Sequence, residues 1–223
     1  DLLYEGDLDD VAISPEEIAY LIEAASRYFS SAITEDEIVS SYSGVRPLYE
    51  DHAASNSTVT RDYVFELDNE GGAPILSVYG GKITTYRKLA EHALEKLGRV
   101  LALPGKAWTA DAPLPGGDMP DGDFAAFLWR ISERYEWLPP EMLLRLARAY
   151  GTRIEAVIGS AGSLGELGAH MGGNLYEAEL RYLFDAEYAR TAQDVLWRRS
   201  KLGLHLPVGA QQAVADWFAA QTS

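Results

Sequence analysis

The 223-residue sequence contains no cysteine, and it has few of the features that mark membrane or secreted proteins. Without thiols there is no disulfide framework, no thiolate metal site and no cysteine nucleophile. No apolar run approaches the roughly 20 residues that a membrane-spanning helix needs, and no basic-then-apolar signal segment opens the sequence. The composition therefore indicates a globular protein and predicts neither a membrane span nor an export signal.

Positive charge is scarce, with 19 Lys and Arg residues against 34 Asp and Glu residues and a formal net charge of −15. A surface of this sign repels nucleic-acid phosphates, so we expect no nucleic-acid partner. A site for a small anion would have to be local, with a few cations close together. We also expect no metal site, because the four histidines lack paired ligand spacing: His52, His92, His170 and His205.

Helix-start signals are clear near the beginning of the sequence. The segment 15–29 is predicted to be helical, with Ser14 as N-cap, Pro15 at the first helical position and Glu17 completing a capping box. Thr34 and Glu37 repeat this arrangement and predict a second, shorter helix. The N-terminal part therefore contributes helices before any strand appears.

Signals for strands follow in the next 40 residues. The stretch 39–48, VSSYSGVRPL, has small and β-branched residues before a proline and predicts a strand. Two β-rich runs within 60–81 are separated by DNEGGAP, which is typical of a hairpin. The second run stops at Gly80-Gly81, and a helix capped by Thr84 or Thr85 is expected after it.

The composition changes after this helix. Residues 106–123 are rich in proline and glycine and predict a linker, and the sequence beyond them has helical periodicity. We predict an α+β fold, with β-strands in residues 1–105 and an all-helical domain in 124–223. Four tryptophans of the second part are interpreted as core residues, because they fall at helical spacing: Trp129, Trp137, Trp197 and Trp217.

The junction Gly80-Gly81-Lys82 is the first candidate site. It is not a P-loop, because Leu76 stands where that motif needs its first glycine and Ile83 stands where it needs Ser or Thr. Glycines still let backbone N–H groups approach a ligand, and a helix start adds about half a positive charge. In the alternative interpretation, the glycines only turn a strand into a helix and Lys82 is solvated.

Arg46 and Arg61 lie at the ends of the neighbouring extended segments. Arginine presents a planar fork suited to phosphate or carboxylate, so both arginines together with Lys82 could form a pocket for an anionic substrate. Alternatively, the arginines form structural ion pairs with nearby carboxylates, for which the candidates are Glu50, Asp51 and Asp62.

Several of these motifs together carry a resemblance to a known family. YSGVRPL, TRDY and LSVYGGKITTYRKLAEHALEKL, in this order, resemble the C-terminal half of aerobic, FAD-dependent glycerol-3-phosphate dehydrogenases, and LPGG, YEAELRYL and LWRRSKLG continue the likeness. The resemblance implies a glycine-oxidase-like flavoprotein in which a segment of the FAD- and substrate-binding domain, residues 1–105, precedes a helical C-terminal domain. It also implies oxidation of glycerol 3-phosphate to dihydroxyacetone phosphate, with electrons passing through FAD to quinone.

The resemblance assigns roles to individual residues. Arg46 and Lys82 would be catalytic and substrate-binding, and Arg61 would be a third cation for the phosphate. The turn formed by Gly80, Gly81, Lys82, Ile83 and Thr84 would contact the pyrimidine end of the flavin, where preorganised N–H donors stabilise developing negative charge. The family also implies a cytoplasmic enzyme, peripheral at the inner face of the bacterial membrane.

One family feature is missing, because no G-x-G-x-x-G sequence opens a βαβ unit to bind the FAD pyrophosphate. We therefore expect the chain to be the C-terminal part of a longer enzyme and to be inactive by itself. In a competing hypothesis, residues 124–223 form a non-catalytic helical module for dimerisation or docking, since this part lacks a cluster of His, Asp and Ser. Under that hypothesis we expect the protein to form a homodimer.

Overall fold

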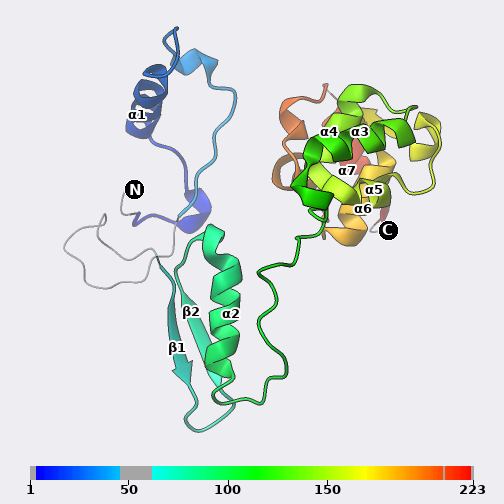
Figure 1. The fold of residues 1–223 in the computed structure, drawn as a ribbon. Coiled ribbons are helices and arrows are strands. Elements are labelled where there is room, and N and C mark those ends of the chain that lie inside the picture. The colour runs from blue at the N-terminus through cyan, green and yellow to red at the C-terminus, as the bar shows by residue number, and fades with distance from the viewer. Residues whose placement is uncertain (1–3, 46–61, 208, 222–223) are drawn as a thin grey trace. The chain divides into compact units, whose positions relative to one another are not determined.

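The computed structural model describes residues 4–45, 62–207 and 209–221 (Figure 1). The chain divides into two compact units, Asp1–Ala110 and Asp111–Ser223. None of the described helices is both long enough and apolar enough to cross a bilayer.

The first unit begins with a 3₁₀ helix, Leu8–Asp10, followed by helix α1, Pro15–Ser26. The predicted capping box is present: the Ser14 hydroxyl accepts from the Glu17 N–H at 3.2 Å, and the Glu17 carboxylate accepts from the Ser14 N–H at 3.0 Å. The second capping box also forms, but it heads only a three-residue 3₁₀ helix, Glu35–Glu37.

The strand predicted at 39–48 is wrong for its described part. Residues 39–45 have no regular structure, and Val39 and Tyr42 are exposed. A strand needs a hydrogen-bonded neighbour, and the described strands of this unit pair with each other instead. The end of the predicted strand, residues 46–48, lies outside the described residues.

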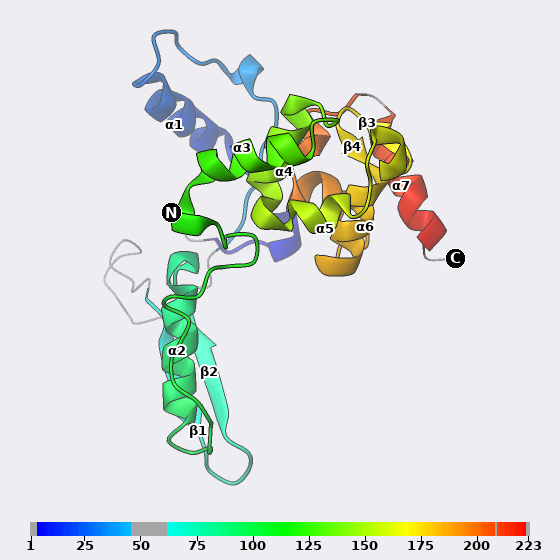
Figure 2. The ribbon, with the colours of Figure 1, turned by 45° about the vertical axis from the view of Figure 1, so that its right-hand side comes forward.

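The predicted hairpin and the helix after it are confirmed. Strand β1, Val64–Asp68, pairs antiparallel with β2, Ile75–Tyr79, in a register that sets Val64 opposite Tyr79. Helix α2, Tyr86–Leu97, runs alongside the hairpin in both views (Figures 1 and 2). Strand, turn and helix therefore form one compact element around the candidate site.

The first unit has no core of its own among its described residues, none of which is buried. In the segment 15–29, which is predicted to be helical, Ile18, Ile22 and Ala25 are half-buried, whereas Leu21 and Phe29 are exposed. Phe29 lies beyond the end of α1. Large apolar side chains are also exposed elsewhere in this unit: Tyr20, Tyr28, Ile75, Val78, Ile83 and Leu94. Among the described residues, these apolar side chains are more exposed than is usual in a closed domain.

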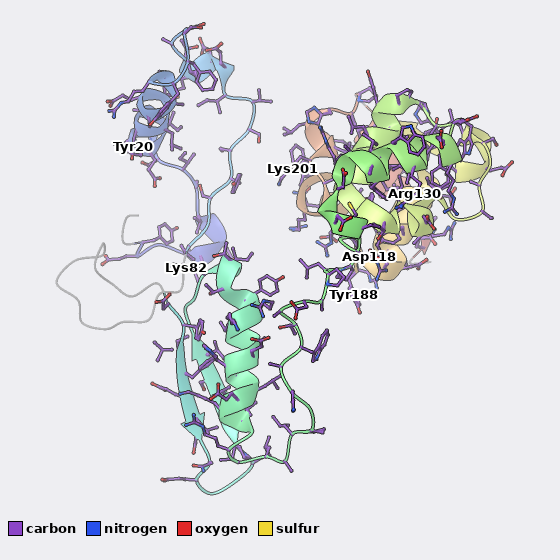
Figure 3. All side chains as sticks on the ribbon, viewed as in Figure 1. Tyr20, Lys82, Asp118, Arg130, Tyr188 and Lys201 are labelled. Atoms are coloured by element: carbon purple, nitrogen blue, oxygen red, sulfur yellow. The ribbon has the colours of Figure 1, made fainter. Side chains whose placement is uncertain are left out.

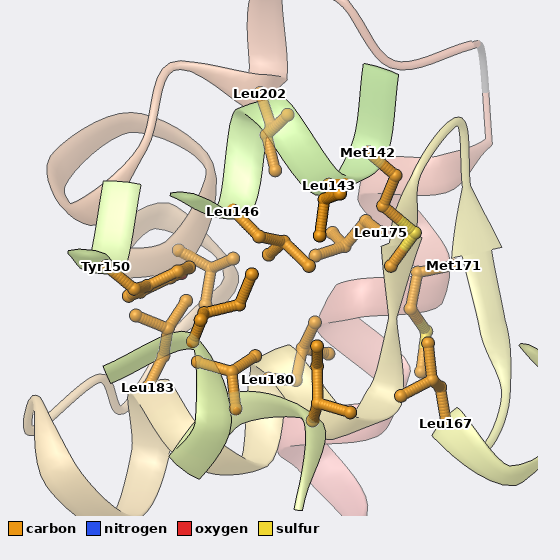
Figure 4. Close-up of a cluster of buried hydrophobic side chains, with 14 of the residues drawn as sticks. Met142, Leu143, Leu146, Tyr150, Leu167, Met171, Leu175, Leu180, Leu183 and Leu202 are labelled. Carbon is orange, nitrogen blue, oxygen red and sulfur yellow. The ribbon is translucent and has the colours of Figure 1, made fainter. Parts of the chain in front are cut away.

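The second unit is mostly helical and has a continuous core. Its helices are α3, Phe124–Arg134; α4, Pro140–Tyr150; α5, Ile154–Ile158; α6, Glu177–Ala186; a π-helix, Asp194–Arg199; and α7, Ala210–Gln221. Short 3₁₀ helices lie at Pro120–Gly122, Gly151–Arg153, Leu164–Leu167 and Leu202–Leu204. Side chains from several of these elements meet in the interior, as Figure 4 shows for Leu146, Leu175, Leu180 and Leu183.

The prediction that the second unit is all-helical is wrong, because it also contains a small β-ladder. Strand β3, His170–Gly172, pairs antiparallel with β4, Leu175–Tyr176. Gly172, at the end of β3, and Gly173, in the turn at 173–174, have φ values of 126° and 54°, a region that glycine enters without steric cost. The helical period of the flanking segments gave no warning of this two-residue turn.

The tryptophan prediction holds in part. Trp137, Trp197 and Trp217 are half-buried and pack against the core of the second unit. Trp129 is 64% exposed, because Phe127 and Ile131 occupy the inward face of α3. Helical spacing alone does not say which side of a helix meets the core.

The division between the two units falls inside the predicted linker, 106–123. Its first part makes a hydrogen bond to the first unit, and its later part makes one to the second unit. The Thr109 hydroxyl donates to Glu91 of α2 at 2.5 Å. This bond, together with the one from Lys88, lowers the pKa of Glu91 to about 2. The carbonyl of Gly116 accepts a bond from the Thr152 N–H at 3.0 Å.

Candidate active site

The glycine pair turns strand β2 into a short 3₁₀ helix, Ile83–Thr85, that leads into α2. Gly80 and Gly81 have φ values of 66° and 107°, which favour glycine strongly. At Gly81 space is limited too, since a Cβ there would lie 3.3 Å from the Cβ of Tyr63. Both the backbone and the packing explain why this turn is built from glycines.

The threonines do not cap the helix with their hydroxyls. Thr85 occupies the N-cap position of α2, but its side chain makes no capping bond. Its hydroxyl and its N–H both donate to the Lys82 carbonyl, each at 2.9 Å. The helical segment begins one turn earlier, in the 3₁₀ helix, where the Tyr86 N–H is bonded to the Ile83 carbonyl.

Lys82 lies at the N-terminal end of this helical segment (Figure 3). Its side chain is 54% exposed, and its ammonium lies 3.8 Å from an Asp62 carboxylate oxygen. The neighbouring Ile83 is 88% exposed. The turn therefore presents a cation and the first N–H groups of a helical segment, which lack intrahelical acceptors, on an open surface.

The two arginines of the predicted anion site, Arg46 and Arg61, lie outside the described residues. Their convergence with Lys82 stays a prediction. Asp62, which the sequence suggested as an ion-pair partner for an arginine, pairs with Lys82.

Sequence reasoning missed a side-chain pair beside the turn. The Tyr63 hydroxyl lies 2.5 Å from Nδ1 of His92 in α2, and the two ring centroids are 5.9 Å apart. The two residues are 29 positions apart, and no motif links them. Only the packing of α2 on the hairpin brings them together.

Donor groups and charge at the turn suit an anion or an electron-rich carbonyl of a heterocycle. No other described feature of the first unit combines left-handed glycines, a helix start and an exposed cation. The second unit offers an open pocket of about 510 Å³ beside Pro113–Gly116 and Thr152–Ala156. It is lined by both acidic and basic side chains, Asp118, Arg153 and Glu155, and so has no clear preference for an anion.

Comparison with curated proteins finds relatives that are longer than this chain. It is 45% identical to D-erythritol 1-phosphate dehydrogenase of Brucella abortus (strain 2308), over 98% of this chain and 43% of that protein. It is 44% identical to aerobic glycerol-3-phosphate dehydrogenase of Escherichia coli (strain K12), over 100% of this chain and 44% of that protein. The chain thus spans less than half the length of the curated relatives it matches.

A solved structure gives the same picture of the fold. The glycerol-3-phosphate dehydrogenase from Bacillus halodurans, complexed with FAD, superimposes with a TM-score of 0.78 at 27% identity, over 98% of this chain and 43% of that one. The family model for the C-terminal domain of alpha-glycerophosphate oxidase matches residues 107–222, which is more than half of the chain. The chain therefore belongs to the family of the C-terminal domain of alpha-glycerophosphate oxidase.

Proposed function

We propose that this chain is the C-terminal part of an FAD-dependent dehydrogenase that oxidises glycerol 3-phosphate to dihydroxyacetone phosphate. The observation that carries the proposal is the 44% identity to the Escherichia coli enzyme, which extends over 100% of this chain. The match therefore includes the glycine turn as well as the helical unit.

The residues at the turn fit a flavin and a phosphorylated substrate. FAD, when bound, supplies the redox chemistry by accepting a hydride from the carbon of the secondary alcohol. Lys82, with Arg46 and Arg61, binds the phosphate by charge-assisted hydrogen bonds. The N–H groups from Gly80 to Thr84 would hold the flavin and would stabilise the negative charge that develops on it.

The state of the first unit supports its assignment to a larger domain. None of its described residues is buried, and large apolar side chains are exposed over α1, the hairpin and the turn. We assign residues 1–105 to the C-terminal segment of an FAD- and substrate-binding domain, whose remaining part would cover these faces. Residues 106–123 would connect this domain to the helical one at 124–223.

The relatives name two substrates of one chemical class. One acts on D-erythritol 1-phosphate, and others act on glycerol 3-phosphate, so both substrates are phosphate esters of short polyols. A cationic site for the phosphate serves either compound, since the charge they share is what it binds. We place glycerol 3-phosphate first, because the motifs around the glycine turn resemble that family.

A fusion protein tests the proposal. The part of the Escherichia coli enzyme that precedes the match would be joined to this chain, and FAD content and dehydrogenase activity would be measured with glycerol 3-phosphate, D-erythritol 1-phosphate and glycerol. We expect bound FAD and activity with at least one phosphate ester, but none with glycerol. A fusion that binds FAD and oxidises neither ester would refute the proposal.

Variants of the fusion test the roles of the cations. Lys82→Ala and Arg46→Ala are each expected to lower kcat/KM about tenfold or more, because each removes charge-assisted bonds to the phosphate. Lys106→Ala is the matched control, since Lys106 lies in the connecting segment and not at the turn. An equal effect of all three substitutions would mean that general charge, and not the site, governs substrate use.

We also propose quinone as the electron acceptor and a peripheral location at the cytoplasmic face of the bacterial membrane. Both rest on the resemblance to the family. Reduction of a soluble quinone analogue by the fusion, coupled to glycerol 3-phosphate, checks the acceptor. Flotation of the fusion with anionic vesicles checks the location.

A further inference from the structure

Tyr63 connects three parts of the first unit. It lies one residue before strand β1, and its hydroxyl reaches His92 of α2 at 2.5 Å. A Cβ added to Gly81 would meet the Cβ of Tyr63 first, at 3.3 Å, and Leu89 of α2 next, at 3.5 Å. The strand entry, the glycine turn and the helix therefore meet at this one side chain.

The same contact bears on the cation of the candidate site. Asp62 is adjacent to Tyr63 in the chain, and its carboxylate lies 3.8 Å from the Lys82 ammonium. An exposed ion pair of this kind holds a long side chain only weakly. A small displacement of the backbone at Asp62 would therefore be enough to break the pair, and Tyr63 is the anchor next to it.

We propose that Tyr63 and His92 are positioning residues for the site at the glycine turn. Their hydrogen bond holds the strand entry on α2, so that Asp62 faces Lys82 and the turn keeps its shape. With a neutral imidazole, the phenol donates to Nδ1 and the ring proton lies on Nε2. The benefit to binding a polyol phosphate rests on the proposed function, whereas the positioning itself does not.

The positioning is tested first on the 223-residue chain without any ligand. Amide resonances of Gly81 and Lys82 would be compared by NMR between the native chain and Tyr63→Phe, with Tyr86→Phe as the control. Tyr86 is also a tyrosine next to the turn, but it has no side-chain hydrogen bond among the described residues. We expect Tyr63→Phe to shift both resonances and Tyr86→Phe to leave Lys82 unchanged.

Two variants of His92 test the same hydrogen bond from its acceptor side. His92→Leu removes the acceptor and is expected to reproduce the shifts of Tyr63→Phe. His92→Asn keeps a polar atom near the position of Nδ1 and is expected to restore the native shifts at least in part. Unchanged Gly81 and Lys82 resonances in both Tyr63→Phe and His92→Leu would overturn the proposal.

The kinetic test uses the fusion protein and a double-mutant cycle with Lys82. Tyr63→Phe is expected to raise KM for the phosphate ester about two- to tenfold, the range that one hydrogen bond supplies, and to change kcat by less than about twofold. In the Lys82→Ala background the same substitution should add nothing, because Tyr63 acts through Lys82.

The outcomes separate the two proposals. A fusion that is inactive with native residues contradicts the proposed function, and the NMR comparison then decides the positioning role alone. An active fusion in which Tyr63→Phe raises KM equally with and without Lys82 contradicts the positioning role and leaves the proposed function in place. Equal FAD content in all variants excludes loss of folding as the cause.

Discussion

Gly151 ends helix α4 at the place where the LPGG segment crosses the second unit, and replacing it by alanine should be severely destabilising. Its φ and ψ are 53° and −133°, and a Cβ there would lie 2.8 Å from the carbonyl carbon of Gly116 and still closer to its oxygen. The Gly116 carbonyl cannot move away freely, because it accepts the Thr152 N–H at 3.0 Å.

Gly159 is a matched control within the same unit. It ends α5 with φ and ψ of 62° and −131°, nearly the conformation of Gly151, but no atom lies within 4 Å of its missing Cβ. Gly159→Ala therefore measures only the backbone strain, about 1–3 kcal/mol. Gly151→Ala adds the displacement of the Gly116 carbonyl and the loss of its hydrogen bond, about 1–3 kcal/mol more.

Urea unfolding of the 223-residue chain, followed by tryptophan fluorescence, would measure the difference. The signal reports mainly on the second unit, which holds Trp129, Trp137, Trp197 and Trp217, whereas the first unit holds Trp108. We expect Gly151→Ala to lose about 2 kcal/mol more than Gly159→Ala. Equal losses would refute the argument that contact with Gly116, and not the positive φ, makes glycine necessary at 151.

Two further predictions concern charged groups of the second unit. Glu179 is 2% exposed and accepts hydrogen bonds from both terminal nitrogens of Arg145, at 2.8 and 2.7 Å. Urea unfolding should show that Glu179→Ala costs about 3–5 kcal/mol of stability, because it leaves a buried charge unpaired, and that the double variant Arg145→Met/Glu179→Leu regains most of this loss. A double variant as unstable as the single one would contradict the prediction. The pKa of Asp194 is lowered to about 2, mainly by the hydrogen bond from the Arg190 N–H. The ionised carboxylate therefore stabilises the fold at pH values above about 3.9, the pKa of Asp in the unfolded chain, and this contribution is lost as the pH falls toward 2. Thermal melting should show Asp194→Asn to be about 2 kcal/mol less stable than the native chain at pH 7, with the gap closing between pH 4 and pH 2, and a gap independent of pH would contradict the assignment.

Local signals in the sequence were sufficient for much of the secondary structure. The capping box at Ser14 and Glu17, the hairpin around DNEGGAP and the glycine turn before α2 all depend on residues close together in the chain. Such features follow from short-range hydrogen bonding and from the backbone freedom of glycine. Of the motifs that carry the resemblance, LPGG, YEAELRYL and LWRRSKLG lie within the residues that the family model matches.

Local signals failed for one predicted strand, one tryptophan and one β-ladder. Residues 39–45 have the composition of a strand but form no regular structure, and Trp129 has helical spacing but is 64% exposed. The β-ladder at Gly172 and Leu175 depends on a two-residue turn inside a helical context. The strand and the tryptophan depend on pairing or burial against residues that are remote in sequence, whereas the ladder pairs residues only three to six positions apart.

For the candidate site, the sequence alone was enough to predict the glycine turn and the cation at Lys82, whereas the ligand of the turn stays a prediction. The tertiary structure decided that Asp62 faces Lys82, that Tyr63 reaches His92 across 29 residues, and that Gly151 needs to be glycine because Gly116 lies against it. A turn is specified by the φ/ψ preferences of its own residues, whereas a contact between distant side chains exists only after the helix and the hairpin have packed.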